Sequence, residues 1–392
     1  MASNPTARNA RIDASLRRAT DAGDVPGVVA MATDRSTLIY EGAYGKRVQG
    51  QPAAMTADTV AWIASMTKAL TAAGVMQLVE QGKLDLDAPA AKVVPDIAAA
   101  QVLEGFDAGG QPRTRAPKRA ITLRHLLTHT AGFGYEIWSA DIAKYQTAKN
   151  IPGITTCQNA ALRTPLLFDP GERWFYSIGI DWAGKMVETV SGMRLGAYLQ
   201  QNVLAPLGMR STGFKITPAM RERLAKIHQR GDDDKLAPQM DLELPQEPEF
   251  DMGGGGLYGT AGDYLEFVRM ILNRGKANGS QVLKPETVDL MSRNSMGDCR
   301  VTLLKTAAPP LSNDAEFFPG VPKAWGLSFQ INLEKAPTGR PAGSLMWAGL
   351  ANTYFWIDQA TGIGGVYITQ VLPFADKKSL PLYYDFESAF YA

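Results

Sequence analysis

The sequence predicts an α/β protein of the α+β type, with one antiparallel sheet shared by the two ends of the chain and a mainly helical region inserted between them. Two observations support this. Near the N-terminus, strand-like residues 28–33 and 38–44 are joined by a short polar turn, and so short a connection makes an antiparallel hairpin. Residues 85–215 are helical and loop-rich, and the chain becomes strand-like again after about residue 320.

The remaining elements follow from hydrophobic periodicity and from glycine and proline stops. Helices are expected at residues 10–22, 69–80, 122–129, 181–192, 195–204, 261–274 and 380–391. Further strands are expected at residues 325–331, 344–347, 353–357 and 364–371, with a hairpin turn at 358–362. Residues 230–250 are polar and rich in Asp, Glu and Pro, so a surface loop is expected there.

These elements divide into two expected domains. Residues 1–84 and 216–392 form a discontinuous sheet domain, and residues 85–215 form a mainly helical domain. This two-part layout places a cleft between the sheet and the inserted domain. We expect the ligand site in that cleft, because ligand sites occur preferentially at domain interfaces.

Composition excludes several classes of protein. The chain has 392 residues, 45% hydrophobic and 20% charged, with a formal net charge of +1. Nothing in that balance favours binding to nucleic acid, and no apolar stretch is long enough to span a membrane. The N-terminus lacks the apolar core of a signal peptide, so we expect a cytoplasmic protein that takes a small-molecule partner. Cys157 and Cys299 show no metal-binding spacing; a single disulfide between them and the oligomeric state both stay open.

The stretch with the clearest chemistry is Ser65-Met66-Thr67-Lys68, at the start of a predicted helix. Residues three apart share one helix face, so the Lys68 amine can lie beside the Ser65 hydroxyl. A desolvated amine accepts the hydroxyl proton and makes serine a nucleophile. The Ser65 N–H would lie at the positive end of the helix, where a developing oxyanion is favoured. About one such spacing is expected by chance in a chain of this composition, so the motif needs further support.

Two other segments offer that support. Tyr176 follows a Pro-Gly turn, and a tyrosine beside a catalytic lysine can accept or relay a proton. The segment 343–350 is a strand that ends in a glycine, and the N–H of Leu350 can supply a second oxyanion donor. Taken singly, the first segment is at least as well explained by a packed tyrosine, and the second by an ordinary strand that ends in a turn.

Other motifs favour structural interpretations. His125 and His129 have an i, i+4 spacing that suits zinc, but Leu126 stands where a metalloprotease carries glutamate, so we expect both rings to bond to the backbone. The glycine run 253–256 lacks the spacing of a dinucleotide site, and we expect a flexible or close-packed loop. The chain contains no G-x-S-x-G nucleophile elbow. We therefore expect neither a metal nor a cofactor.

Several segments, taken in order, resemble the serine β-lactamase and penicillin-binding-protein superfamily, and within it the family VIII carboxylesterases. Ser65-Met66-Thr67-Lys68 is similar to the S-x-x-K element, Tyr176-Ser177-Ile178 to the tyrosine motif in its esterase form, and Trp347-Ala348-Gly349 to the W-G-G of these esterases. Residues 123–132, 170–171, 206–209 and 255–263 are also similar to recurring family segments. Residues 102–107, 181–185 and 287–291 are similar to a fungal branch, the acyltransferases of statin biosynthesis.

The resemblance implies a β-lactamase-like fold with its active site in the cleft between the two domains. It implies a serine carboxylesterase that hydrolyses short- to medium-chain or bulky hydrophobic esters, with catalytic residues Ser65, Lys68 and Tyr176. The oxyanion hole would be the N–H groups of Ser65 and Leu350. An apolar substrate pocket is expected from the residues Tyr135, Trp138, Tyr258, Trp347 and Gly349. Acyl transfer on the same acyl-enzyme is an alternative, as is a weak β-lactamase or D-aminopeptidase. Trp347 replaces the lysine that would pair with a β-lactam carboxylate, which argues against efficient β-lactam hydrolysis.

Overall fold

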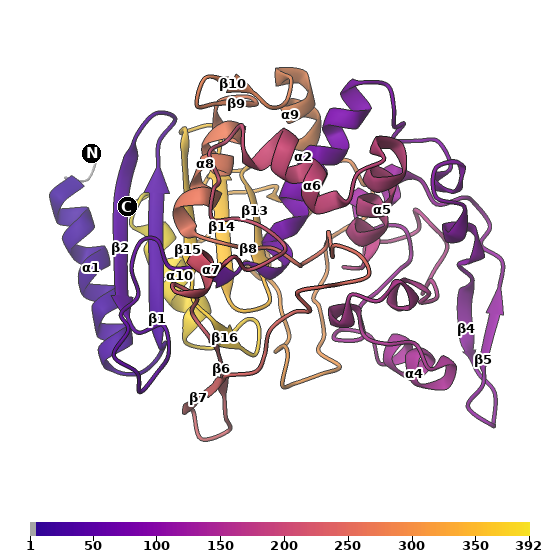
Figure 1. Ribbon diagram of the computed structural model, residues 1–392, viewed down its shortest axis with the longest axis horizontal. Coiled ribbons are helices and arrows are strands. Elements are labelled where there is room, and N and C mark those ends of the chain that lie inside the picture. The colour runs from indigo at the N-terminus through magenta and orange to yellow at the C-terminus, as the bar shows by residue number, and fades with distance from the viewer. Residues whose placement is uncertain (1–4) are drawn as a thin grey trace.

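The computed structural model describes residues 5–392, and its centre is a seven-stranded antiparallel sheet built from both ends of the chain. The strand order is β11-β12-β13-β14-β15-β1-β2, so the N-terminal hairpin pairs with β15 from the C-terminal part. Figure 1 shows this sheet on one side of the molecule and most of the inserted helices on the other. The predicted fold class is therefore confirmed. The boundaries of the two domains stay a prediction.

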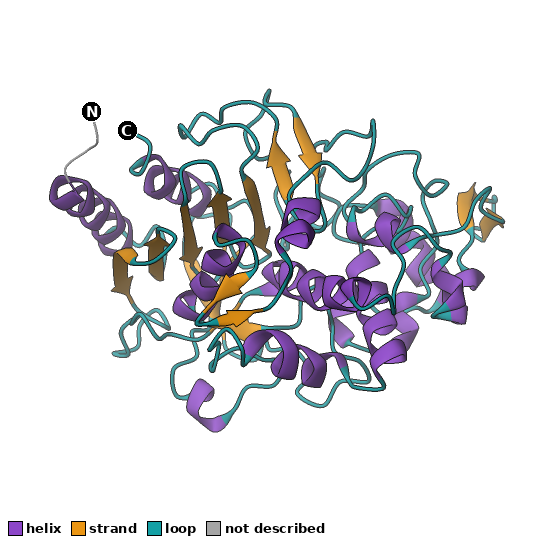
Figure 2. Cartoon of the chain, turned by 90° about the horizontal axis from the view of Figure 1, so that it is seen from above, coloured by secondary structure: helices purple, strands orange, loops and turns teal. Residues whose placement is uncertain are grey.

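The sheet is assembled from short strands that are buried on both faces in its centre. Its strands are β1 (Gly27–Thr33), β2 (Leu38–Gly45), β11 (Lys323–Trp325), β12 (Gln330–Asn332), β13 (Leu345–Gly349), β14 (Thr353–Asp358) and β15 (Ile363–Ile368). Every residue of β13 and β14 is buried. Helix α10 packs against β14 through aromatic side chains, and α8 and the helical turn before α2 also pack against this part of the sheet, while α1 covers β1 and β2 (Figure 2). In the outer strand β2 only Tyr40 and Gly42 are buried, as expected for a strand at the edge of a sheet.

The helices match most of the predicted positions. They are α1 (Pro5–Asp21), α2 (Thr67–Glu80), α3 (Leu123–Leu127), α4 (Ala140–Lys149), α5 (Gly179–Ser191), α6 (Leu195–Leu199), α7 (Pro218–Arg221), α8 (Ala261–Leu272), α9 (Pro285–Met291) and α10 (Ser379–Ser388). Short helical turns lie at Ala64–Met66, Ala90–Lys92, Pro95–Ala99, Ile154–Thr156, Asn159–Leu162 and, as a π-helix after α6, Gln200–Leu204. Within residues 5–392, no helix is both long enough and apolar enough to cross a bilayer.

Smaller pairings complete the fold. They are the hairpins β4 (Val102–Phe106) with β5 (Pro112–Arg115) and β9 (Lys276–Ala277) with β10 (Ser280–Gln281), the pair β3 (Ala61–Trp62) with β8 (Tyr258–Gly259), and a three-stranded sheet of β6 (Ile227–Arg230), β7 (Leu236–Gln239) and β16 (Val371–Leu372). The pairing of β3 with β8 places the chain just before Ser65 beside the segment that follows the glycine run.

Three predicted elements were wrong in detail. The strand expected at 325–331 is two antiparallel strands joined by a tight turn, in which the Gly326 N–H donates to the Phe329 carbonyl at 2.8 Å. The surface loop expected at 230–250 contains β7, because its backbone pairs with β6 rather than with water. The strand expected to run to residue 371 ends at Ile368, and β16 leaves the main sheet to pair with β6. Hydrophobic periodicity does not show where a strand is interrupted by a turn or which strand it pairs with.

Helix α2 links the sheet to the helical region. It is buried on nearly every side, including Thr67, Lys68 and Thr71, and it packs against α5 and α6. In Figure 1 it lies in the centre of the molecule, between the sheet and the inserted helices. A helix that is buried all round needs few polar side chains, and so its one buried lysine stands out.

Candidate active site

Ser65 lies in the short helical turn Ala64–Met66, which leads directly into α2. The preceding residue, Ala64, has φ of 44°, in the left-handed region that costs a non-glycine residue roughly 1 kcal/mol or more. Ala64 and Met66 are buried, whereas Ser65 is half-buried and lines a cavity. The turn therefore presents the serine side chain while its neighbours anchor the backbone.

Lys68 reaches Ser65 as the three-residue spacing predicts. Its Nζ donates to Ser65 Oγ at 3.2 Å, to the Tyr135 hydroxyl at 2.9 Å and to the Gly254 carbonyl at 2.5 Å. The lysine side chain is fully buried. Its three hydrogen bonds hold the amine in one place.

Burial also sets the proton affinity of Lys68. Removal of the ammonium from water lowers the pKa of Lys68 to about 7, and the negative charge of Asp181 acts in the opposite direction. A substantial fraction of the amine is therefore neutral near neutral pH. An amine in that state, 3.2 Å from a serine hydroxyl, can act as a general base.

Tyr176 completes the predicted catalytic group. Its hydroxyl oxygen accepts a hydrogen bond from Trp347 Nε1 at 2.9 Å and also shares one with Ser65. The Lys68 Nζ lies 4.6 Å from the centre of the tyrosine ring. Burial raises the pKa of Tyr176 despite the two hydrogen bonds, so the side chain is a neutral phenol at neutral pH. It can relay a proton, but it is a poor resting base.

Tyr135 is closer to the chemistry than expected. It was predicted to be a wall of the substrate pocket, and it does line the cavity, but its hydroxyl also accepts from the Lys68 amine. Its ring lies 5.4 Å from that of Tyr176. No local sequence signal marks this contact, because Tyr135 is far from Lys68 in the chain and lies in a loop.

The cavity beside Ser65 has a volume of about 40 Å³. That is room for a few water molecules or for a short acyl chain. Its lining is mostly apolar and comprises Trp62, Ala64, Ser65, Tyr135, Ile137, Trp138, Ile154, Thr155, Met252, Gly254, Gly255 and Leu350. Sequence reasoning named Ser65, Tyr135, Trp138 and Leu350 among these residues. It missed the others, since they come from separate segments of the chain that only the fold brings together.

Two predicted pocket residues lie elsewhere. Trp347 and Tyr258 are both absent from the cavity lining, which corrects the expectation that they form its walls. The Trp347 indole is directed at the Tyr176 hydroxyl instead. The Tyr258 hydroxyl accepts from the Leu244 N–H at 3.0 Å, and its ring belongs to a small hydrophobic cluster with Trp62 and Ala64, which do line the cavity. An aromatic residue near a site in sequence need not face it, because a strand sends alternate side chains to opposite faces.

Gly349 does not line the cavity but allows β13 to lie close to the segment before Ser65. A Cβ atom at this position would lie 2.3 Å from the Ile63 carbonyl oxygen, so only glycine lets β13 approach the chain before Ser65 so closely. The next residue, Leu350, lines the cavity with Ser65. This arrangement supports the predicted pairing of the Ser65 and Leu350 N–H groups as an oxyanion hole, which stays a prediction.

The histidines and the glycine run have the structural roles expected of them. His125 Nδ1 accepts from the Thr122 N–H at 3.2 Å and so caps α3, while His129 Nδ1 accepts from the Ser177 N–H at 3.3 Å. The glycine run is close-packed. It was not predicted, however, that the Gly254 carbonyl would accept a hydrogen bond from the Lys68 amine.

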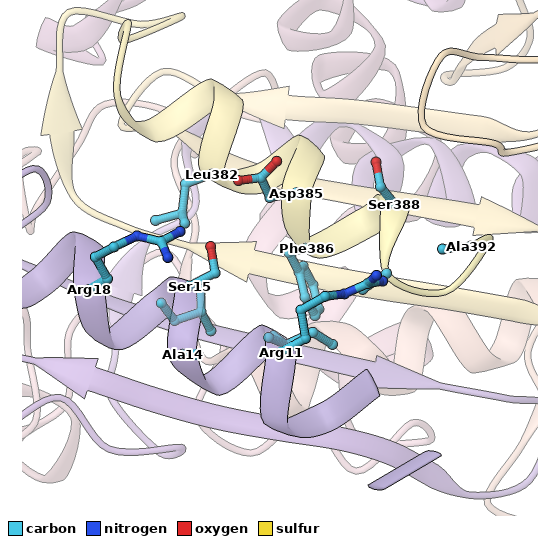
Figure 3. A pocket seen from close by; sticks show the side chains of 12 residues that line it. Arg11, Ala14, Ser15, Arg18, Leu382, Asp385, Phe386, Ser388 and Ala392 are labelled. Atoms are coloured by element: carbon cyan, nitrogen blue, oxygen red, sulfur yellow. The ribbon is translucent and has the colours of Figure 1, made fainter. Parts of the chain in front are cut away.

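A second hollow, of about 430 Å³, lies between α1 and α10. Figure 3 shows Arg11 and Arg18 on one helix and Asp385 on the other. It is larger than the cavity at Ser65, but its lining contains no serine paired with a buried base. In Figure 1, α1 lies at one end of the molecule, well away from α2 in the centre. We therefore place the candidate active site at Ser65.

The beta-lactamase family model matches residues 12–389, nearly the whole chain. This chain belongs to the beta-lactamase family. Within the family, the chain is 32% identical over 396 residues to monacolin J acid methylbutanoyltransferase of Aspergillus terreus, covering 97% of this chain and 95% of that protein. It is also 32% identical over 385 residues to lovastatin esterase of Penicillium rubens, covering 92% and 93% of the two chains.

Solved structures of the beta-lactamase family support the same fold. Unliganded simvastatin synthase from Aspergillus terreus superposes with a TM-score of 0.85 at 31% identity, over 100% of this chain and 99% of that one. A hydrolase with promiscuous acyltransferase activity, EstCE1, has a TM-score of 0.78 at 24% identity over 99% of both chains, and at that identity it supports the fold alone. The predicted β-lactamase-like architecture is therefore confirmed.

Proposed function

We propose that the protein is a serine carboxylesterase, which hydrolyses short- to medium-chain or bulky hydrophobic carboxylic esters through an acyl-enzyme on Ser65. The observation that carries this proposal is the buried Lys68 amine, with a pKa of about 7, held 3.2 Å from Ser65 Oγ. Such a pair is a nucleophile with its base in place. The small apolar cavity beside it fits a short acyl chain better than a charged group.

In the acylation step, Ser65 Oγ bonds to the ester carbonyl carbon, and its proton passes to neutral Lys68. The carbonyl oxygen becomes an oxyanion facing the N–H groups of Ser65 and Leu350. When the carbon–oxygen bond to the alcohol breaks, the leaving oxygen receives a proton from Lys68 through the Tyr176 hydroxyl. The raised pKa of Tyr176 favours this assignment, with lysine as the base and tyrosine as the relay.

In the deacylation step, a water molecule takes the place of the alcohol. Its oxygen bonds to the acyl carbon while Lys68, neutral again, accepts its proton. The bond to Ser65 Oγ then breaks, and the serine oxygen recovers a proton from the lysine. The net reaction is ester plus water to acid plus alcohol.

Acyl transfer to an alcohol is the second candidate. It uses the same acyl-enzyme, and similar proteins bear the names of both a methylbutanoyltransferase and an esterase. A β-lactamase role has weaker support. Trp347 stands where a lysine would bind the β-lactam carboxylate, and its indole is buried against Tyr176.

A mass-spectrometric screen separates these candidates. The protein is mixed with p-nitrophenyl esters from acetyl to octanoyl, quenched in acid and digested, and the peptide that contains Ser65 is examined. We expect an acyl adduct on Ser65, most abundant with the shorter chains because the cavity is small. Added alcohols should raise p-nitrophenol release only modestly. A large, saturable acceleration would favour acyl transfer, and nitrocefin turnover that rivals the ester would favour a β-lactamase. No adduct with any ester would contradict the proposal.

The pH dependence of activity should follow the Lys68 amine. Since its pKa is lowered to about 7 and the neutral form is the base, kcat/KM should fall about tenfold per pH unit below that pKa and level off above it. Initial rates with p-nitrophenyl acetate, corrected for spontaneous hydrolysis, measure the acid limb. A rate that is flat from about pH 5 to pH 8 would show that Lys68 is not the titrating base.

A further inference from the structure

Asp181 is a buried carboxylate in the first turn of α5 that the proposed mechanism does not use. The residue is 1% exposed. Its Oδ1 accepts a hydrogen bond from the Gly254 N–H at 2.8 Å, whereas Oδ2 has no hydrogen-bond partner among the described residues. A buried carboxylate with an unpaired oxygen is costly, and in most proteins it is paired with a cation or protonated.

Gly254 joins this carboxylate to the catalytic lysine. The N–H of Gly254 donates to Asp181, and the carbonyl of the same residue accepts from the Lys68 amine at 2.5 Å. A Cβ atom at position 254 would lie 2.4 Å from Asp181 Oδ2, so only glycine lets the backbone lie against the carboxylate. The aspartate, the glycine and the lysine therefore form one chain of contacts that ends at Ser65.

Among the described residues near these contacts, Lys68 is the cation that balances the charge of Asp181. The titratable groups that interact electrostatically with one or both of them are Tyr135, His129, Cys157 and Tyr176. Burial raises the pKa of the tyrosines and of the cysteine thiol, and it lowers the pKa of His129, so these four are neutral near neutral pH. Burial raises the pKa of Asp181 to about 6, and the charge of Lys68 opposes that rise.

We propose that Asp181 is a positioning residue of the catalytic centre, which fixes the Gly254 carbonyl against Lys68 and supplies the negative charge that stabilises the lysine ammonium formed when Ser65 is acylated. The inference rests on the proposed function, since it concerns the base of that reaction. Without the carboxylate, nothing opposes the effect of desolvation, which lowers the pKa of Lys68, and the lysine becomes a weaker base. The carboxylate does not touch the reacting atoms.

The test is the pH dependence of Ser65 labelling by a p-nitrophenyl alkylphosphonate, followed by mass spectrometry. In wild-type protein the labelling rate should rise with a midpoint near pH 7. In Asp181→Asn, which keeps an oxygen to accept from Gly254, the midpoint should move down by about one pH unit and the plateau rate should fall. The matched control is Asp263→Asn, a half-buried aspartate in the first turn of α8, which bonds Ser211 and Thr212 and should leave the midpoint unchanged.

The outcomes separate the two proposals. No labelling of wild-type Ser65 contradicts the proposed function. Wild-type labelling with the expected midpoint, together with an unshifted Asp181→Asn midpoint, overturns only the role of Asp181. Should Asp181→Asn not fold, the reverse experiment uses carbon-13 NMR of the aspartate carboxyls in wild type and in Lys68→Met. Removal of the cation should raise the pKa of the Asp181 carboxyl, and an unchanged titration overturns the inference.

Discussion

Replacement of Ser65 by alanine should abolish turnover of p-nitrophenyl butyrate, with a fall in kcat of about 10³-fold or more. The substitution removes the oxygen that becomes acylated in the proposed reaction, and the Tyr176 phenol that remains is neutral at neutral pH. The fold should remain intact, because Ser65 is half-buried and, among residues 5–392, its hydroxyl bonds only to Lys68 and Tyr176. Initial rates and thermal unfolding measured on one preparation test both statements.

The matched control for this variant is Ser36→Ala. Ser36 is an exposed serine in the turn between β1 and β2, where its hydroxyl bonds to Asp34. Its loss should leave turnover within a factor of about two, since surface substitutions away from special features have small effects. A Ser65→Ala protein that keeps the wild-type rate would contradict the assignment of Ser65 as the nucleophile.

Replacement of Lys68 by methionine should lower kcat/KM by about 10²- to 10⁴-fold, the usual contribution of a general base. Methionine matches the length and volume of the buried stem but has no group that accepts a proton. The serine hydroxyl then has to lose its proton without help. Phosphonate labelling of Ser65 should slow by a similar factor, and the acid limb of the pH profile should disappear with the amine that causes it.

Lys323→Met is the matched control, because Lys323 is also buried, with its side chain 3% exposed. Its amine bonds to Glu316 at 3.0 Å and to the carbonyls of Phe318 and Val321, and it has no contact with Ser65. The control variant should lose stability but keep its kcat. Equal activity losses in the two variants would indicate that burial of any lysine, and not the base at Ser65, underlies the effect.

Much of the sheet and of the catalytic core was predictable from local sequence. Runs of strand-forming residues and short turns identify β1, β2, β14 and β15, because composition and turn chemistry are local properties. The pairing of β1 with β15 is not local, and only the layout of the two chain ends suggested it. Where strands were misjudged, the reasons differ: β16 pairs with β6, which is far away in the chain, whereas β7 forms a hairpin with β6 from a polar segment that resembles a loop.

By itself, the sequence determined the fold class and the contact between Ser65 and Lys68, because residues three apart on a helix are neighbours whatever surrounds them. The tertiary structure alone decided which groups surround that pair. It turned Trp347 from an expected pocket wall into the hydrogen-bond donor to Tyr176, and it brought the Tyr135 hydroxyl to the lysine amine. It also placed Asp181 behind Gly254. The proton affinity of Lys68 depends on desolvation and nearby charge, which arise only when distant segments pack together.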